Sequence, residues 1–482
     1  MFLYTGLIIS APEIFLLIMA CLILMLGVFS KLNVAKWSFY VTQVSVLVAA
    51  YTVWHIFYLK GYTTEYGFSG LFVLDKLAVT LKIFILISMF FTFWYSHLYN
   101  ENNNIPACEF YVLGLLATIG MMVLVSSANF VTLFLGMELM SLPVYAMVAL
   151  IRGRERCVEA AIKYFVIGAV ASAMFLYGVS LFYGATHTLD LKTASSIIMV
   201  IPASQQLILY FGLVFVIAGI AFKLGAAPFH AWVPDVYDGA PNSVTLLISA
   251  APKLAAFGLA VRFLVDAVPA LTVQWSHVLI VMALLSIALG NVVAVIQINI
   301  KRMLAYSSIA QIGYMLLGLA CGTQRGEAAA FFYMTTYALT SLGAFGMIAL
   351  LSKSGFEANE LSDFSGLGQR APWLAFMMLL MMFSLAGLPP FVGFIAKIGV
   401  LEALITVHSA WIAVVAIIFS IIGAYYYIRV VKVMYFEDAP IVQEKIQCQK
   451  NVTFAMTVNG LLVLLLGIFP TQLFMLCHSV FH

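Results

Sequence analysis

Four charged residues lie inside long apolar stretches of this 482-residue sequence: Glu138, Lys223, Lys253 and Lys397. A charge at the centre of a lipid bilayer costs roughly 2.5–3.5 kcal/mol on insertion scales. Pairing of the four charges for structure alone is the simplest alternative. One carboxylate cannot neutralise three ammonium groups, however, so pairing leaves lysines over. The residue types therefore favour a functional role.

The chemistry that suits these residues is proton transfer. Burial disfavours the charged form of a lysine, and a nearby carboxylate favours it again. A buried lysine whose acidic partner moves can therefore take up and release one proton. Sodium binding suits them less well, because a sodium ion needs several oxygen ligands and the group contains one carboxylate.

A relay between buried charges needs bridging polar groups, and several lie in the same apolar stretches. The candidates are His230, Gln311, Tyr306 and Tyr425, the last in the run GAYYYIRVV. For each tyrosine, packing or a position at the membrane interface is the alternative role.

Three further charges have simpler interpretations. Glu159 and Lys163 are four residues apart, which predicts an exposed helix pair worth a few tenths of a kcal/mol. Their position beside the basic run RGRER suggests, more weakly, the mouth of a path on the inner side. Lys82 lies nearer a predicted helix end, so we expect its side chain to extend to the membrane surface.

Prolines interrupt two of the apolar segments. FKLGAAPFHAW contains Pro228, and FSLAGLPPFVGF contains Pro389 and Pro390. Proline removes a helix hydrogen bond and leaves carbonyls free. Lipid tolerates such a gap only where it lines a hydrated cavity or is buried in protein. Paired broken helices indicate an ion path near the midplane, and two unrelated kinks are the alternative.

The elements that hold these residues must be membrane-spanning helices. Apolar residues make up 64% of the chain and charged residues 9%, and the mean hydropathy is +1.07. Soluble domains contain about 25% charged residues, so the composition excludes a soluble enzyme, a disordered tail and a nucleic-acid binder. The apolar runs are continuous rather than alternating, and each is close to the ~20 residues of a crossing.

We therefore expect an all-α polytopic membrane protein with fourteen spans: 7–29, 36–59, 76–98, 108–126, 128–150, 158–184, 204–226, 242–267, 273–296, 302–322, 326–352, 373–406, 408–434 and 451–475.

Lys and Arg predict the orientation. With the N-terminus outside, fourteen basic residues lie in or beside inward loops, five beside outward loops, and four lysines inside spans. Both termini are then outside. Glu13 is the first charge, so the basic region of a cleaved signal peptide is missing.

No large soluble domain is expected, because the longest polar stretches are loops at 60–75, 353–372 and 435–450. We find no glycine-rich phosphate loop. The six cysteines show no CxxC pair and no metal-ligand spacing. The chain therefore has no room for a nucleotide, a flavin or an iron–sulfur cluster, and its energy must come from an ion gradient or from partner subunits.

The sequence contains a weak internal repeat. Residues 159–178 and 327–346 share a Glu-Ala-Ala opening, an aromatic pair and a closing aromatic-Gly. Two units of five spans fit the count, and an odd number of spans per unit makes the repeat inverted. The expected organisation is 1–107 for the N-terminal helices, 108–267 and 268–434 for the repeats, and 435–482 for the C-terminal loop and last helix.

Four motifs carry a family resemblance: FKLGAAPFHAWVPDVYDGAP (222–241), SAAPKLAAFG (249–258), NIKRMLAYSSIAQIGY (299–314) and SLAGLPPFVGFIAKIGVL (384–401). They resemble the antiporter-like subunits of respiratory complex I, the NADH–quinone oxidoreductase, and the subunit N group most closely. The resemblance implies fourteen helices, inverted five-helix repeats, broken helices 7 and 12, and proton translocation within the membrane arm of a bacterial inner-membrane complex.

The resemblance also assigns the residues. The family's proton-relay glutamate falls on Glu138, and its three lysines fall on Lys223, Lys253 and Lys397. It implies that disturbing a Glu138–Lys223 pair starts proton transfer along the lysines. Several relatives carry a histidine where this chain has Gln311, and a glutamine does not titrate, so any relay there must run through water or neighbouring residues.

In this family, NADH oxidation, FMN, the iron–sulfur clusters and the main quinone (ubiquinone) chamber belong to other subunits. The resemblance therefore implies no redox cofactor on this chain. The implied partners are the other membrane-arm subunits, the hydrophilic arm through them, the lipid bilayer and protons.

Three rival interpretations stay open. A subunit of a multisubunit sodium–proton antiporter shares the fold and the buried lysines, but the DVYDGAP and APK stretch favours the complex I family. The second alternative is a purely structural membrane subunit, but leucines would pack inside a membrane at a lower free-energy cost than buried lysines. A stand-alone enzyme has the least support.

Overall fold

The computed structural model describes the chain except for residues 1, 30–33, 203–205, 353–355, 439–449 and 482. Among the described residues, thirteen helical segments are long and apolar enough to cross a membrane. Of the residues used above, Lys31, Lys353, Lys445 and Cys448 lie outside the described part. The long helices are α2 (Ala11–Phe29), α3 (Val34–Leu59), α4 (Lys76–Asn102), α5 (Ala107–Val125), α6 (Phe130–Val148), α7 (Glu155–Thr186), α9 (Gln206–Leu224), α13 (Thr272–Val295), α14 (Ile300–Ala320), α15 (Gln324–Leu351), α19 (Ala410–Phe436) and α20 (Lys450–Ile468).

The membrane fold is confirmed, and one expected span is divided. The span expected at 373–406 consists of α17 (Pro372–Ala386) and α18 (Val392–Val407), on either side of the prolines. This division explains why thirteen long segments are present where fourteen spans were expected. The inverted repeat and its boundaries stay a prediction.

One expected span is confirmed but kinked, and another ends earlier than expected, each near a proline. The span expected at 242–267 is interrupted at Ala250, two residues before Pro252, so that it consists of α11, α12 and η3. The span expected at 451–475 ends at Ile468, shortly before Pro470. A proline ring clashes with the preceding turn of a helix, which favours an end at both places. The new elements are α11 (Asn242–Ser249), α12 (Ala251–Val261), the π-helix η3 (Arg262–Ala267) and α21 (Thr471–Ser479).

The chain forms two compact units, described here separately. Unit 1 contains residues 1–93, 105–224 and 251–277. Its helices α5 and α6 lie unusually close together, because a Cβ atom on Gly120 would meet the backbone nitrogen of Met140 at 2.2 Å. Small residues at helix interfaces permit this approach in membrane proteins. The close contact holds α6, which carries Glu138, firmly within unit 1.

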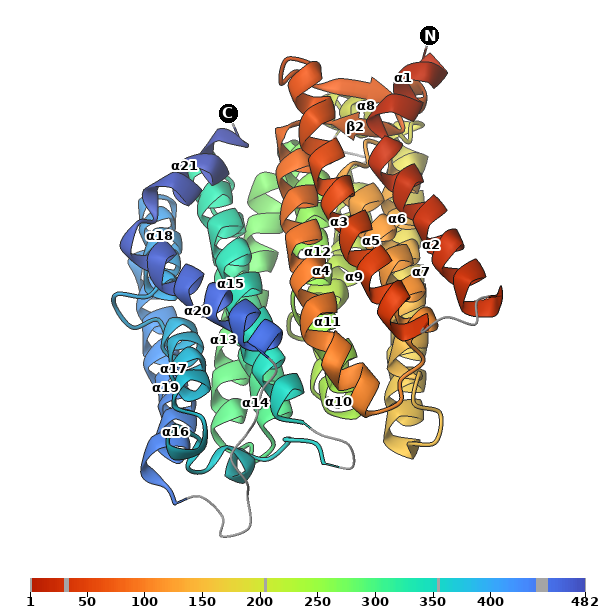
Figure 1. Cartoon of the computed structure of the whole chain (residues 1–482). Helices are drawn as coiled ribbons and strands as arrows, with labels where there is room; N and C mark the ends of the chain where they lie inside the picture. Colours follow the sequence, from red (N-terminus) through yellow and green to blue (C-terminus); the bar gives the residue numbers. More distant parts are fainter. Residues whose placement is uncertain (1, 30–33, 203–205, 353–355, 439–449, 482) are drawn as a thin grey trace. The chain divides into compact units, whose positions relative to one another are not determined.

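One end of unit 1 carries the short elements of the loops. Strand β1 (Glu65–Gly67) pairs antiparallel with β2 (Phe72–Leu74). Figure 1 shows β2 beside α1 (Phe2–Ile9) and α8 (Leu191–Ile198) at this end. Asp190 caps α8 by accepting a hydrogen bond of 2.8 Å from the backbone N–H of Thr193. This end of the unit is therefore an ordered cover over the helices.

Unit 2 contains residues 94–104, 225–250 and 278–482. Its core is formed by α14 and α15, whose residues are buried almost throughout. Helix α10 (Trp232–Gly239) packs against α14, and α11 packs against α15. An ion pair of 3.0 Å between Arg302 and Asp235 ties α10 to the start of α14. Figure 1 shows α17, α19 and α20 in the C-terminal part of this unit.

Candidate functional site

The two helix breaks share one local design. α9 ends at Leu224 and α17 ends at Ala386, and a glycine with positive φ follows each end. Glycine adopts this left-handed conformation without the steric cost that other residues meet. Both breaks lie where the prolines predicted them. The glycines are Gly225 (φ +76°) and Gly387 (φ +80°), and the cis X–Pro bonds are Ala227–Pro228 and Pro389–Pro390.

At the first break, a lysine contacts the carbonyl that the helix end leaves free. The Lys253 ammonium donates a hydrogen bond of 3.4 Å to the carbonyl oxygen of Leu224. Lys253 lies at the start of α12 and is 1% exposed. Carbonyls at the last turn of a helix carry partial negative charge and lack a partner within the helix. The end of α9 therefore stabilises a cation inside unit 1.

Lys223, in the last turn of α9, contacts a polar face of α6. Its ammonium donates hydrogen bonds to the hydroxyls of Ser141, at 2.8 Å, and Tyr145, at 3.4 Å. Ser141 and Tyr145 follow Glu138 by three and seven residues, which places all three on one side of the helix. The side chain of Lys223 is buried. Unit 1 thus aligns an acid and two hydroxyls along one helix face.

Glu138 acts on Lys223 through its charge rather than through contact. Its carboxylate accepts a short hydrogen bond from the Ser172 hydroxyl of α7. Its negative charge favours the ammonium of Lys223, but the two side chains form no direct ion pair within the described residues. The pairing of Glu138 with Lys223 is therefore electrostatic, without a direct contact between the two side chains. Ser141 lies at the contact instead.

At the second break, the part of the chain that the structure describes holds no acidic partner for Lys397. Its ammonium donates to the carbonyl oxygens of Ala386, at 2.9 Å, and Leu385, at 3.3 Å. It also donates to the hydroxyl of Ser420, at 2.9 Å. The ring of Tyr314 lies 5.1 Å from the ammonium nitrogen. Neutral dipoles and an aromatic face therefore hold this buried cation in unit 2.

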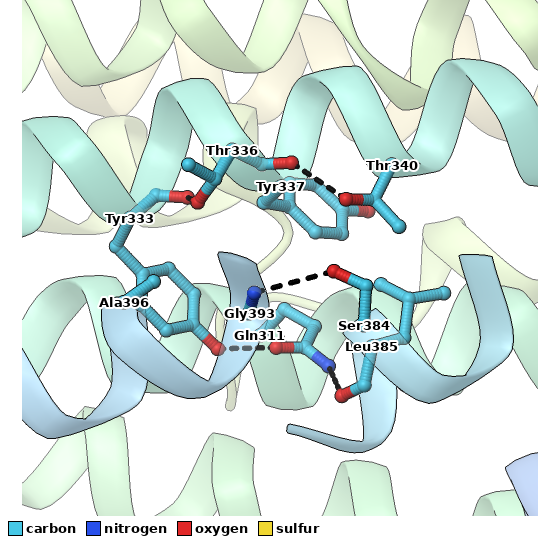
Figure 2. Close-up of a pocket in the computed structure, with 9 residues that line it drawn as sticks. All are labelled: Gln311, Tyr333, Thr336, Tyr337, Thr340, Ser384, Leu385, Gly393 and Ala396. Carbon is cyan, nitrogen blue, oxygen red and sulfur yellow. Dashed lines mark hydrogen bonds between the residues drawn. The ribbon is translucent and has the colours of Figure 1, made fainter. Parts of the chain in front are cut away.

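Gln311 connects this lysine to a group of hydroxyls. Its amide nitrogen donates to the carbonyl of Leu385, at 3.0 Å, which Lys397 also contacts, and to the hydroxyl of Tyr427, at 2.9 Å. Its amide oxygen accepts a short hydrogen bond from Tyr333. Figure 2 shows Gln311 between Tyr333 and Leu385. Tyr427 in turn makes a short hydrogen bond with Ser307. Hydrogen bonds of Gln311 therefore link the Leu385 carbonyl at the second break to Tyr333 and Tyr427, and through Tyr427 to Ser307. The amide of Gln311 does not titrate.

A small cavity lies beside this network. Its volume of about 10 Å³ is close to the least that holds one water molecule. Its wall includes Ala396, the neighbour of Lys397 in α18, and hydroxyl-bearing residues of α15 (Figure 2). Several hydroxyl groups and room for one water molecule therefore lie close to Lys397. The lining residues are Gln311, Tyr333, Thr336, Tyr337, Thr340, Ser384, Leu385, Gly393 and Ala396.

The other predicted relay residues lie outside these networks. Tyr425 is 59% exposed, whereas Tyr427 of the same run is buried and contacts Gln311. Tyr306 is half-buried and takes no part in the Gln311 network. His230 is half-buried, and its Nδ1 atom has no hydrogen-bond partner among the described residues. Among the described residues, Gln311 is the one candidate of the four that shares a hydrogen-bond acceptor with a buried lysine, since both it and Lys397 donate to the Leu385 carbonyl.

The exposed pair predicted at the start of the sixth span is present. Glu159 and Lys163 approach to 2.8 Å on α7, with side chains that are 65% and 44% exposed. This geometry fits the surface interpretation.

The expectation for Lys82 is wrong. Its ammonium is fully buried and lies 2.7 Å from a carboxylate oxygen of Glu13. Extension to the surface was expected because Lys82 is near a helix end. The structure instead covers this end of α4 and supplies an acid from α2.

Several residues of the networks were missed by sequence reasoning. Ser141 and Tyr145 had a usable signal, because their spacing from Glu138 is that of one helix face. Ser307 had a similar signal, because it precedes Gln311 by four residues in α14. Ser420 and Tyr333 had none, because they come from other helices and their residue types are common in membrane spans.

The comparisons with known proteins agree with the motifs. The family described as NADH:quinone oxidoreductase/Mrp antiporter, TM matches residues 127–423. A protein of Coxiella burnetii, NADH-quinone oxidoreductase subunit N, is 57% identical over 98% of both chains.

Solved structures give the same fold. A chain of respiratory complex I from Thermus thermophilus with bound aureothin is 30% identical, with a TM-score of 0.81 over 96% of this chain and 98% of that one. A chain of the Mrp complex from Dietzia sp. reaches a TM-score of 0.85 over 98% and 97% of the two chains. Its identity is only 20%, so it shows the fold alone. The family match and the 57% identical relative together show that this chain belongs to the subunit N family of bacterial NADH–quinone oxidoreductases.

Proposed function

We propose that this chain is a proton-translocating membrane-arm subunit of NADH–quinone oxidoreductase. It couples electron transfer from NADH to quinone to proton movement through Glu138, Lys223, Lys253 and Lys397. The observation that carries the proposal is the pair of helix breaks, each of which turns free carbonyls toward a buried lysine. The printed name of the 57% identical relative supports the assignment to this complex.

In unit 1, the charge of Glu138 controls the proton on Lys223. The carboxylate favours the ammonium form, and Ser141 and Tyr145 accept its hydrogen bonds. When Glu138 is neutralised or moves, Lys223 loses this support inside a buried site and gives up a proton. Lys253 is the next acceptor, because the Leu224 carbonyl stabilises its ammonium form.

In unit 2, Lys397 is the last of the three lysines to carry the proton. Its carbonyl and hydroxyl partners stabilise the ammonium form without fixing it by an opposite charge. Gln311 and Tyr427 continue the hydrogen-bonded path from the shared Leu385 carbonyl. Because Gln311 cannot titrate, hydroxyl groups and water transfer the proton along this path.

The proposal includes the setting of the chain. It is a multi-pass protein of the bacterial inner membrane with both termini in the periplasm. Its partners are the other membrane-arm subunits and, through them, the hydrophilic arm. NADH, FMN, iron–sulfur clusters and quinone are bound by partner subunits, and this chain binds no redox cofactor.

A native gel and one substitution test the proposal. A tagged chain is expressed in its own host, extracted in mild detergent and stained for NADH dehydrogenase activity. We expect it to migrate with that activity in a large assembly. Lys253→Met should then lower proton pumping by the assembled complex about 100-fold, the loss typical for removal of a proton-transfer group. Lys163→Met, at an exposed lysine, is the matched control.

Two outcomes would contradict the proposal. Migration in a smaller assembly without NADH dehydrogenase activity, together with sodium-dependent transport in vesicles, would favour the sodium–proton antiporter. Full pumping by an assembled Lys253→Met complex would favour a structural subunit.

A further inference from the structure

Unit 1 contains a buried ion pair that the mechanism above does not use. The ammonium of Lys82, on α4, lies 2.7 Å from a carboxylate oxygen of Glu13, on α2. The two side chains are 0% and 6% exposed. The ring of Phe72 also lies against the ammonium, at 4.6 Å from the ring centre. The pair is therefore sealed by an aromatic side chain of strand β2.

Stability does not explain this pair. Apart from the ion contact, neither the Glu13 carboxylate nor the Lys82 ammonium has a hydrogen-bond partner among the described residues. Removing two charges from water is costly, and a buried pair compensates for that only when further hydrogen bonds satisfy its atoms. Two apolar side chains of similar volume would stabilise the same space at least as well. The pair therefore contributes little to stability, and its charges are free to serve another role.

A second charged group links the pair to the surface. The positive charge of Lys82 acts on Asp75, which caps α4 by accepting a 2.8 Å hydrogen bond from the Ala78 N–H. Asp75 also binds Arg262 through two hydrogen bonds of 2.7 Å. Arg262 contacts Asp266 at 3.0 Å, and the side chain of Asp266 is 37% exposed. Charges of alternating sign therefore lead from the sealed pair to the surface of unit 1.

The two halves of this chain of charges differ in how firmly they are held. Burial raises the pKa of the Asp75 carboxyl, but the charge and hydrogen bonds of Arg262 outweigh burial and the pKa is lowered. Arg262 is further fixed by donating to the backbone carbonyl of Val125, at 3.0 Å. Asp75 and Arg262 are therefore held by several contacts, whereas the Glu13 and Lys82 side chains are held by a single ion contact and the ring of Phe72.

The helix that carries Lys82 packs against the helix that carries Lys253. Gly258 of α12 packs against α4, because a Cβ atom there would meet Leu81 at 2.9 Å. Leu81 is the neighbour of Lys82 along the chain. Arg262 follows α12 directly in η3. Lys253 and the group of charges therefore share one helix within unit 1.

We propose that Glu13 and Lys82 form a further proton-binding site of this subunit, between the buried lysines and the outer surface. A proton that reaches the pair forms an O–H bond on the Glu13 carboxylate and neutralises it. Lys82 keeps its positive charge and is drawn to Asp75. Release of the proton past Asp266 breaks the O–H bond and restores the pair. This inference rests on the proposed function, because it needs protons to enter unit 1.

A charge-neutral double variant tests the proposal in the whole complex. Glu13→Leu combined with Lys82→Met removes both titrating groups and leaves no unpaired charge, so the complex should assemble. We expect the number of protons pumped per NADH oxidised, measured in proteoliposomes, to fall about twofold while NADH oxidation continues. The matched control replaces the half-exposed pair Lys60 and Glu65, at 3.8 Å, by methionine and glutamine and should change nothing.

Three results overturn the proposal. An unchanged pumping ratio in the double variant would mean that the pair binds no transported proton. Failure of the double variant to assemble, with the surface-pair variant assembled, would make the pair structural. A third result is a pumping ratio that falls in the double variant but stays unchanged in the single variants Glu13→Gln and Lys82→Met. That result would also contradict proton binding at the pair. Lys253→Met is measured alongside, and full pumping by that variant would overturn the proposed function as well.

Discussion

The lysines at the two helix breaks have different electrostatic surroundings. In unit 1, an acid acts on one of the two lysines, since the charge of Glu138 favours the ammonium of Lys223. In unit 2, Lys397 contacts two carbonyls, the Ser420 hydroxyl and an aromatic ring, none of which carries a negative charge. The backbone design of the two breaks is the same, but the groups that stabilise the lysine ammonium differ: an acid acts on Lys223, and neutral groups surround Lys397.

This difference separates two ways to move a proton from a buried lysine. An acid that changes its own charge or position can control Lys223 directly. Neutral dipoles cannot change charge, so the proton on Lys397 must respond to hydration or to a charge supplied from outside its own contacts. Unit 1 is therefore suited to receive the signal and unit 2 to hold the proton until its release.

Removal of Lys397, the lysine at the second break, gives the largest expected loss of proton pumping. Lys397→Met leaves the freed carbonyls of Leu385 and Ala386 without a cation, and pumping should fall about 100-fold. Proton uptake by inverted membrane vesicles measures the loss. Lys432→Met is the control, because Lys432 is 68% exposed on α19. Pumping by Lys397→Met at the control rate would show that Lys397 carries no transported proton, and unit 2 would then have no role in proton transfer through this lysine.

An acid placed beside Lys397 should make unit 2 resemble unit 1. Ser420→Asp puts a carboxylate where the hydroxyl now accepts a 2.9 Å hydrogen bond from Lys397. A buried opposite charge holds the ammonium form, so turnover should slow about tenfold, equivalent to ~1.4 kcal/mol. Ser420→Asn changes the shape without the charge and should slow turnover far less. Equal slowing by the two variants would show that shape, not charge, matters at this position.

The shared backbone design is tested at its glycine. Gly387→Ala forces a side chain into a positive φ, at a cost of about 1–2 kcal/mol. Its Cβ atom would also meet the Lys397 side chain at 2.8 Å. Thermal unfolding of the purified complex should show the loss. Gly399→Ala is the matched control, because its Cβ atom meets nothing nearer than 4.0 Å. A loss no larger than the control's would mean that the break tolerates other conformations.

The hydroxyl path in unit 2 gives the smallest effect. Tyr427→Phe removes the contacts to Gln311 and Ser307 and should cost about 1 kcal/mol, with pumping reduced a few-fold. Vesicle pumping rates of Tyr427→Phe and Tyr425→Phe provide the comparison. Tyr425 is exposed, so its loss should have no effect. Equal rates would exclude Tyr427 from the path.

The cost of buried charge made the central residues predictable. A lysine in an apolar stretch has no inexpensive explanation, and the three lysines near the prolines lie at the breaks as that argument required. The helical boundaries were predictable where apolar length decided them. They failed at Ile468, where the helix ends shortly before Pro470 within a continuous apolar run.

The partners of these residues were harder to predict, because they depend on how helices rotate and pack. Three consecutive tyrosines look alike in sequence, yet only the orientation of α19 decides that Tyr427 faces Gln311 and Tyr425 does not. Lys82 was assigned to the surface because it lies near a predicted helix end. Its partner Glu13 comes from another helix.

The central claim is that the charge of Glu138 controls proton transfer in unit 1. The most direct test is the number of protons pumped per NADH oxidised by a reconstituted complex that carries Glu138→Gln. Glutamine keeps the size of the side chain and can still accept the hydrogen bond from Ser172, but it has no charge. With Glu159→Gln, at an exposed glutamate, as the control, we predict that the ratio falls sharply in Glu138→Gln alone. An unchanged ratio in Glu138→Gln would contradict the account.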